Sequence, residues 1–350
     1  MKNNATLELY KEYPEPDREA ATAQKIINLM ETQMVKNYRG GRMLRDVHSK
    51  GHGCVKAKFT VRPDLPDELR VGVFKEPRTF DAVIRYSNTG ALAPIGGVAT
   101  DITRDARGMA IKLVGVTGEK ILEDEREADT QDFLMFTPNN FFAAGPDGFF
   151  DLTVALTTNT LVFAWFLITH PSMTLVLAGS LKKVPNLFEL QYFSAVPYQF
   201  GSKAVKFSAK PVFARQSEMP NRPSDNYLRE RMQEQLAKEE VSFDFMIQFQ
   251  KDPYAMPIEN ALVPWDEEVS PFLKVATVTI PRQSFASAKQ LEDCDNLSFT
   301  PWHSLPEHRP LGSISRVRRL VYQEISRFRH QRNDVPREEP TVDTLDSEGI

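Results

Sequence analysis

Arg318 and Tyr322, four residues apart near the end of the chain, are the first side chains that could do chemistry together. Apolar residues around them recur at helical spacing: Ile314, Val317, Val321, Ile325 and Phe328. Ser313 is the expected N-cap of this helix. Residues four apart share a helix face, and a guanidinium beside a phenol favours the ionised phenolate, a hard oxygen ligand for ferric iron. The alternative is a basic, solvated helix whose tyrosine only packs.

His48 is the second candidate for chemistry. It lies between Arg45 and two glycines, Gly51 and Gly53, which allow a sharp turn or a close approach of the backbone. A lone histidine at the start of a strand can be structural as well as catalytic. These residues by themselves leave both roles open.

The composition is that of an ordinary globular protein, and it excludes some functions. The chain has 350 residues, of which 41% are hydrophobic and 26% charged, and its net charge of -4 provides no basic surface for nucleic acid. Its two cysteines, Cys54 and Cys294, are too few for a disulfide framework, so a reducing cytosol is expected. The N-terminus has no apolar h-region of a secretory signal. We therefore predict a cytoplasmic protein without a nucleic-acid partner.

A set of strands must position these side chains. Seven segments are predicted as strands, because apolar residues alternate with polar ones or form short runs: 54–61, 82–87, 108–114, 131–136, 203–210, 241–249 and 275–280. Helices are predicted over 17–37 and 221–240 and at the Arg318–Tyr322 segment. Several strands with few helices between them predict an antiparallel barrel or sandwich with helical additions, in the α+β class.

The most apolar part of the chain is 149–181. Its stretch 159–181 is long enough to span a bilayer, but Pro171 interrupts it next to His170. We predict two buried helices joined at this break and no membrane span. The segment is expected to form a core, and a lipid site is the alternative.

Four segments, in this order along the chain, resemble motifs of the haem catalases. They are R-x-V-H-x-K-G-x-G at 45–53, V-I-R-Y-S at 83–87, R-D-A-R-G-M-A-I-K at 104–112 and R-x-x-x-Y at 318–322. The segment E-H-R-P-L-G at 307–312 is more similar to the small catalase-related haem proteins, which include allene oxide synthase-like and peroxidase members. The resemblance covers about 44–330 and implies a catalase-like antiparallel β-barrel core with surrounding helices.

The resemblance also suggests how the chain is divided. We expect an N-terminal segment with a helix (1–40), a catalase-like haem domain (41–332) and a polar tail (333–350). The tail is expected to be disordered, because it is rich in proline and acidic residues. Large catalases carry a longer N-terminal arm and a C-terminal helical domain that build their tetramer, so this chain is expected to form a smaller homo-oligomer.

The resemblance implies haem b as cofactor, with Tyr322 as the axial ligand of the iron and Arg318 keeping it ionised. Five further residues match positions that contact the haem in the family: Arg45, Val47, Arg85, Phe149 and Arg329. The three arginines match groups that bind the propionates, a task suited to bidentate pairs. Val47 matches an apolar residue above the ring, and Phe149 matches a phenylalanine on its face.

On the distal side, the resemblance assigns catalysis to His48. It would take the proton from a bound peroxide and return it to the departing oxygen, which requires a neutral imidazole. Ser87 would orient it. The family's distal asparagine is missing, because an ungapped match places Phe136 and Thr137 where catalases have paired asparagines. Thr137 is the candidate replacement, and a shift of register to Asn139 or Asn140 stays open.

The missing distal amide affects which peroxide the protein is expected to use as substrate. Loss of one preorganised donor at a reacting oxygen costs roughly two to three orders of magnitude in rate. We therefore predict a haem peroxidase or catalase-related oxidoreductase that cleaves the O–O bond of hydrogen peroxide or an organic, lipid-like hydroperoxide. The alternatives are a haem-binding or haem-sensing protein without significant turnover, and a catalase-like haem enzyme recruited to biosynthesis.

Overall fold

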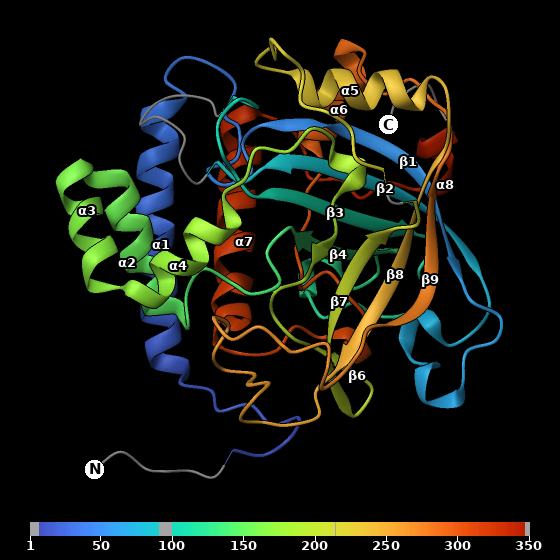
Figure 1. The fold of residues 1–350 in the computed structure, drawn as a ribbon, viewed down its shortest axis with the longest axis horizontal. Coiled ribbons are helices and arrows are strands. Elements are labelled where there is room, and N and C mark those ends of the chain that lie inside the picture. Colours follow the sequence, from blue (N-terminus) through green and yellow to red (C-terminus); the bar gives the residue numbers. More distant parts are fainter. Residues whose placement is uncertain (1–6, 91–99, 214, 347–350) are drawn as a thin grey trace.

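Antiparallel strands form a closed barrel at the centre of the molecule (Figure 1). The computed structural model describes residues 7–90, 100–213 and 215–346. Its strands are β1 (Gly51–Val61), β2 (Thr79–Asn88), β3 (Arg107–Val114), β4 (Thr130–Phe136), β5 (Tyr192–Phe193), β6 (Tyr198–Phe200), β7 (Lys203–Pro211), β8 (Val241–Phe249) and β9 (Leu273–Ile280). They pair in the order β5-β4-β3-β2-β1-β9-β8-β7, and β5 also pairs with β7. This pairing closes an eight-stranded barrel, and β6 pairs with β7 next to β5.

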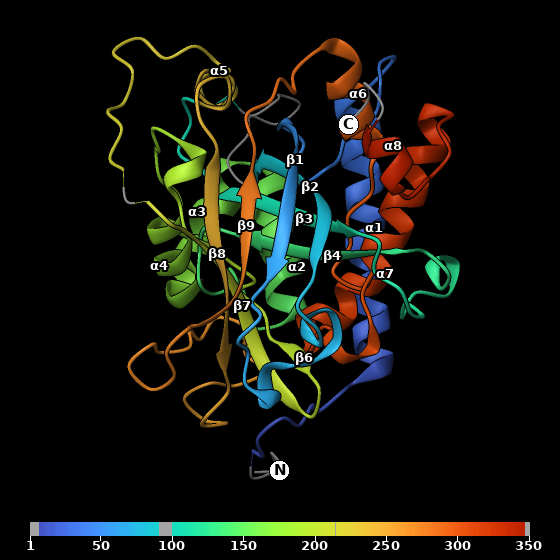
Figure 2. The ribbon, with the colours of Figure 1, turned by 90° about the vertical axis from the view of Figure 1, so that its right-hand side faces the viewer.

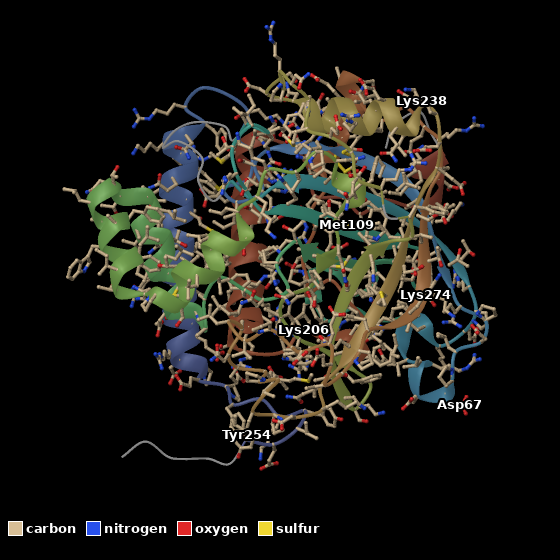
Figure 3. All side chains as sticks on the ribbon, viewed as in Figure 1. Asp67, Met109, Lys206, Lys238, Tyr254 and Lys274 are labelled. Atoms are coloured by element: carbon tan, nitrogen blue, oxygen red, sulfur yellow. A yellow bond between two sulfur atoms is a disulfide. The ribbon has the colours of Figure 1, made fainter. Side chains whose placement is uncertain are left out.

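The interior of the barrel is filled by aromatic side chains. The rings of Phe59 and Phe133 both lie 5.0 Å from that of Phe245, measured between centroids. Phe207 lies at the same distance from Phe133. Figure 3 shows side chains throughout the enclosed space, with Met109 near its centre. Because this interior is packed, we expect a ligand site between the outer face of the sheet and the helices.

Helices cover one side of the barrel and its ends. They are α1 (Pro16–Asn37), α2 (Pro146–Thr158), α3 (Thr160–Thr169), α4 (Pro171–Ser180), α5 (Tyr227–Leu236), α6 (Ala288–Asn296), α7 (Ser313–Asn333) and α8 (Val342–Asp346). Short 3-10 turns are η1 (Asp67–Leu69), η2 (Gly72–Phe74), η3 (Glu123–Glu125), η4 (Leu187–Glu189) and η5 (Pro306–His308). The two long helices, α1 and α7, run side by side next to the barrel in Figures 1 and 2. Ile26 and Met30 of α1 pack with Val317 and Val321 of α7.

The structure confirms the α+β class and all seven predicted strands. The prediction that Ser313 caps the last long helix is wrong, because Gly312 occupies the N-cap with φ +86°. A Cβ atom on Gly312 would lie 2.4 Å from the carbonyl oxygen of Ile258, so the turn into α7 requires glycine. The predicted helix over 221–240 is shorter, since α5 comprises Tyr227–Leu236.

The apolar segment 149–181 forms the predicted break between two helices, but its helices are less buried than predicted. The break at His170–Pro171 is confirmed, because α3 ends at Thr169 and α4 begins at Pro171. Burial is incomplete, however, and several large apolar side chains of both helices face outward. No helix in the described ranges is by itself long and apolar enough to cross a bilayer. Only α3 and α4 together reach that length, and the chain bends by 111° between them.

Residues 334–346, which belong to the segment predicted as a polar tail, lie against the barrel. Glu339 pairs with Lys112 of β3 at 2.6 Å. Leu345 in α8 packs with Cys54 and Cys294 in a small apolar cluster. These contacts join the end of the chain to strands that come more than two hundred residues earlier.

Candidate functional site

A cavity of about 360 Å³ lies among the outer side of β2–β4, the loop before β1, and helices α1, α2, α4 and α7. Nine of the ten residues predicted for the site line it: Arg45, Val47, His48, Ser87, Arg85, Phe149, Arg318, Tyr322 and Arg329. The tenth, Thr137, is not in the lining. The motifs that lie far apart in the sequence therefore meet at one cavity.

Helix α7 brings Arg318 and Tyr322 to this cavity on the same face. The Nη2 of Arg318 donates a hydrogen bond to the Tyr322 Oη at 3.1 Å. The guanidinium also lies 5.1 Å from the centre of the phenol ring. Their spacing of four residues thus produces the contact that the helix prediction implies. Tyrosine oxygen is a known ligand of haem iron, and the side chain of Tyr322 lines this cavity.

The backbone of His48 adopts an uncommon conformation. Its φ is +62°, in the left-handed region that few residues other than glycine occupy. Two hydrogen bonds hold this turn: the His48 N–H donates to the Thr89 carbonyl at 3.0 Å, and the Arg85 Nη2 donates to the His48 carbonyl at 3.0 Å. Strained residues that the surrounding structure holds in place are concentrated at functional sites.

The imidazole of His48 is fixed by Ser87 and by a glycine. Its Nδ1 lies 2.9 Å from the Ser87 Oγ, which is the contact expected of an orienting hydroxyl. Gly108 on the next strand lies against the ring, because a Cβ atom there would be 2.7 Å from its Nδ1 and Cε1. Burial lowers the pKa of His48 to about 3, and the charges of Arg85, Arg318 and Arg45 act in the same direction. The imidazole is therefore neutral at physiological pH.

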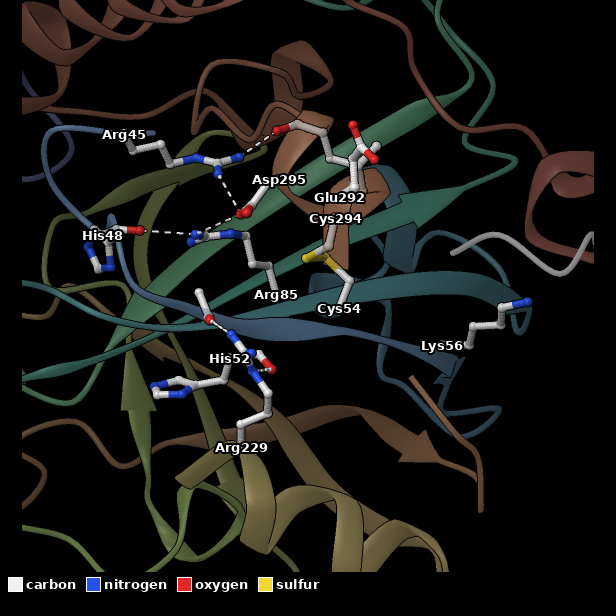
Figure 4. Close-up of a disulfide and its surroundings, with 12 residues drawn as sticks. Arg45, His48, His52, Cys54, Lys56, Arg85, Arg229, Glu292, Cys294 and Asp295 are labelled. Atoms are coloured by element: carbon white, nitrogen blue, oxygen red, sulfur yellow. Dashed lines mark hydrogen bonds and ion pairs between the residues drawn. A yellow bond between two sulfur atoms is a disulfide. The ribbon is translucent and has the colours of Figure 1, made fainter. Parts of the chain in front are cut away.

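Three buried or nearly buried arginines form one wall of the cavity, and two of them, Arg45 and Arg85, face the carboxylate of Asp295 (Figure 4). Arg45 and Arg85 each approach the Asp295 Oδ1 at 3.8 Å. Arg329 donates to the main-chain carbonyls of Asp295 and Leu297. Asp295 was not predicted for the site, and no local pattern singled it out.

This wall has more positive charge than its own carboxylate can balance. Burial lowers the pKa of Arg45, and it lowers the pKa of Arg85 and Arg329 (the latter to about 9) with the help of repulsion from Arg45. The Arg85 Nε is buried without a hydrogen-bond partner among the described residues. Two further negative charges would balance the wall, and haem b carries two propionates. The charge of this wall and the oxygen donor of Tyr322 therefore fit haem.

A disulfide lies directly behind the arginine wall. Cys54 of β1 and Cys294 of α6 are bonded, with their Cα atoms 5.4 Å apart, and Cys294 is the neighbour of Asp295 (Figure 4). Two cysteines were predicted to be too few for a disulfide framework. The structure has this single disulfide between them. It ties the strand that follows His48 to the helix that carries the carboxylate.

Aromatic side chains line one part of the cavity, around Phe136. Phe136 lies 6.1 Å from Phe141 and 5.4 Å from Phe142, and Phe141 lies 5.4 Å from Phe149. All four line the cavity. The surface around Phe136 is therefore apolar, and the match of Phe136 to a distal asparagine of catalases stays a prediction.

The three candidates to replace the distal amide all point elsewhere in the structure. The Thr137 Oγ1 accepts a hydrogen bond from the Arg107 N–H at 3.2 Å. Asn140 donates to the Leu262 carbonyl at 2.7 Å, and Asn139 is exposed. Among the described residues, Gln33 and Asn37 of α1 do bring carboxamides to the cavity lining, and neither was predicted for the site.

Comparison with solved structures shows a catalase-like fold. A fungal catalase superposes with a TM-score of 0.64 at 17% identity, covering 83% of this chain and 60% of that one. A bacterial catalase gives 0.65 at 17%, over 92% and 65%, and catalase A from Saccharomyces cerevisiae gives 0.63 at 16%, over 95% and 70%. The chain thus spans less than two thirds of the length of the first two. No family model and no curated protein matches the sequence.

Proposed function

We propose that this protein is a haem-dependent oxidoreductase that cleaves the O–O bond of a peroxide, and that an apolar organic hydroperoxide suits its cavity better than hydrogen peroxide. The observation that carries the proposal is the neutral, oriented imidazole of His48 in the same cavity as the Arg318–Tyr322 pair. The catalase-like fold supports a catalase-related haem protein.

His48 would move the proton of the reaction. When its Nδ1 donates a hydrogen bond to Ser87, its Nε2 keeps a lone pair and can accept the proton of the hydroperoxide O–H. As the O–O bond breaks, the same nitrogen returns this proton to the departing oxygen, which leaves as an alcohol or as water. Haem, when bound through Tyr322, would supply the electrons for that cleavage.

The aromatic surface supports the choice of an organic substrate. Phe136, Phe141 and Phe142 line the cavity together with Leu152 and Leu156 of α2. None of the described residues of 136–142 offers it an amide. A missing donor slows a reaction that depends on fixing two small oxygens by roughly 100- to 1000-fold. An apolar hydroperoxide gains binding energy from the same surface, because it buries its chain there.

Two substrates tested in parallel distinguish an organic-hydroperoxide enzyme from a small catalase and from a haem-binding protein. We expect the haem-loaded protein to consume a fatty-acid hydroperoxide rapidly, with loss of the diene absorbance, and to release little oxygen from hydrogen peroxide. Vigorous oxygen release with slow lipid consumption would instead identify a small catalase. A stable haem complex that reacts with neither peroxide would refute turnover and leave a haem-binding protein.

Acid is expected to inactivate the protein by unfolding it, not by protonating His48 in place. Burial lowers the pKa of His48 and His308 to about 3 and that of His52 and His303 to about 4. In the unfolded chain these groups take up protons near pH 6.5, so the unfolded state is favoured as the pH falls. Each histidine then lowers the free energy of unfolding by about 1.4 kcal/mol per pH unit. Buried carboxyls such as Asp46, whose pKa burial raises to about 6, act in the opposite direction.

The measurement is a pair of pH profiles, one of hydroperoxide consumption and one of circular dichroism. We expect a constant rate between about pH 6.5 and 8, because the pKa of His48 is about 3 and that of Arg329 about 9, so neither group titrates there. Below that range, both signals should fall together. A rate that halves near pH 6.5 while the circular dichroism is unchanged would show that His48 titrates near its ordinary pKa.

A further inference from the structure

The hairpin of α3 and α4 carries a large exposed apolar surface. Its exposed side chains are Leu161 (82% exposed), Trp165 (66%), Ile168 (72%) and Leu175 (74%). The three on α3 are spaced by four and three residues, so they share one face of the helix. We call these four residues the hairpin face. Single exposed apolar residues are ordinary on protein surfaces, but a group of four large ones marks an interaction site.

We propose that the hairpin face docks on the surface of a lipid bilayer. The chain from 152 to 181 contains no aspartate, glutamate, lysine or arginine. Lys182 and Lys183 follow at once, and both are exposed. An uncharged apolar helical hairpin that contains a tryptophan and is followed by two lysines matches the interface of a bilayer, where acyl chains take up the apolar groups and anionic headgroups attract the lysines.

The geometry fits a segment that lies in the interface rather than one that crosses the membrane. The bend of 111° at His170 turns α4 away from the axis of α3, so the pair offers two short helices and no straight span. In Figure 1, α3 lies at the outer edge of the molecule, beyond α1 and α2 as seen from the barrel. A flat surface can therefore reach α3 without meeting the barrel.

Helices α2, α3 and α4 follow one another in the chain, and together they connect the hairpin face to the cavity. Leu152 and Leu156 of α2 and Leu177 of α4 line the cavity. Docking would place the apolar wall of the cavity beside the hydrocarbon region, from which an apolar hydroperoxide could be taken up. This last step rests on the proposed function, whereas docking itself does not.

Tryptophan fluorescence of the whole protein tests the docking without haem or substrate. Trp165 is exposed, while Trp265 and Trp302 are only 3% and 5% exposed, so a change on docking reports mainly on Trp165. With vesicles of phosphatidylcholine and phosphatidylglycerol, we expect co-sedimentation, a blue shift of the emission and quenching by brominated acyl chains. The Trp165→Phe variant should bind the vesicles but lose the blue shift.

Matched variants identify the surface. The triple variant Leu161→Ser, Ile168→Ser, Leu175→Ser should lose co-sedimentation, whereas Phe213→Ser with Tyr254→Ser should not. Those two control residues are 73% and 62% exposed elsewhere on the molecule. Replacing Lys182 and Lys183 by glutamine should weaken binding to anionic vesicles by roughly 25-fold, about fivefold for each lysine, with little effect on neutral vesicles.

Other results would overturn the proposal. Absence of vesicle binding, or binding that the triple variant retains, would do so. A dimer whose emission is already blue-shifted without lipid, and which the triple variant converts to a monomer, would assign the hairpin face to a second copy of the chain. Failure of docking leaves the proposed reaction intact, and docking without hydroperoxide consumption would refute only the reaction.

Discussion

Tyr322→Phe is expected to leave the protein folded and to remove its stable binding of haem. The change deletes the oxygen that receives the hydrogen bond of Arg318 at 3.1 Å and faces the cavity. Removal of a group that merely orients a metal ligand lowers affinity about 10- to 100-fold. Removal of the ligand itself should therefore cost about 100-fold or more. Titration of the apoprotein with haem, followed by its absorbance, gives the affinity directly.

Tyr38→Phe is the matched control for this experiment. Tyr38 also lines the cavity, but it comes from the end of α1 and donates its hydrogen bond to the Arg45 carbonyl at 3.2 Å. Its loss should leave both the affinity and the ferric spectrum unchanged. If Tyr322→Phe also bound haem with an unchanged spectrum, Tyr322 would not be the axial ligand, and the proposed function would fail.

The barrel was predictable because its strands carry their signal locally. In β8, Val241, Phe243, Phe245 and Ile247 alternate with less buried residues, so the period of two marks both the strand and its inner face. β5 and β6 contain only two and three residues, too few for any alternation to appear. The closure of the barrel through β5 depends on pairing between distant segments, which a local pattern does not encode.

Site residues that belong to a sequence motif could be predicted. A residue that joins the site only through contacts with distant segments could not. His48, Arg85 and Tyr322 were identified from three separate motifs, and the structure places them around one cavity. Asp295 contacts Arg45 across 250 residues of sequence, and its own surroundings give no hint of that partner. The helix that carries it did have a signal, since Ser287 and Gln290 form a capping box at its start.

The segment predicted as a polar tail makes contacts that its composition does not reveal. Its proline and acidic residues favour disorder when they are considered alone. Lys112 is completely buried, however, and it needs anionic partners there, which Asp132 and Glu339 supply at 2.7 and 2.6 Å. A carboxylate of the tail is therefore part of the charge balance of the barrel. That requirement is visible only once β3 and β4 are in place.

His48→Asn is expected to leave haem bound and to slow hydroperoxide turnover by about 100- to 10,000-fold, the usual contribution of a positioned acid–base group. Asparagine is chosen because it tolerates a positive φ better than most residues, and His48 has φ +62°. Loss of activity then reports on the imidazole and not on a distorted backbone. The readouts are the haem titration and the rate of diene loss, measured on the same preparation. Undiminished turnover would exclude His48 from the reaction.

Ser87→Ala tests how His48 is positioned, because Ser87 would act only through the hydrogen bond of 2.9 Å to the imidazole. Its expected effect is smaller, since the ring still rests on Gly108, and burial and the arginine charges still lower the pKa of His48. If proton transfer by His48 is common to both substrates, each variant should slow hydrogen peroxide and the lipid hydroperoxide by the same factor. A variant that slowed only one substrate would instead act on its binding. The ratio of the two rates therefore separates the chemistry of His48 from the selectivity of the aromatic surface around Phe136.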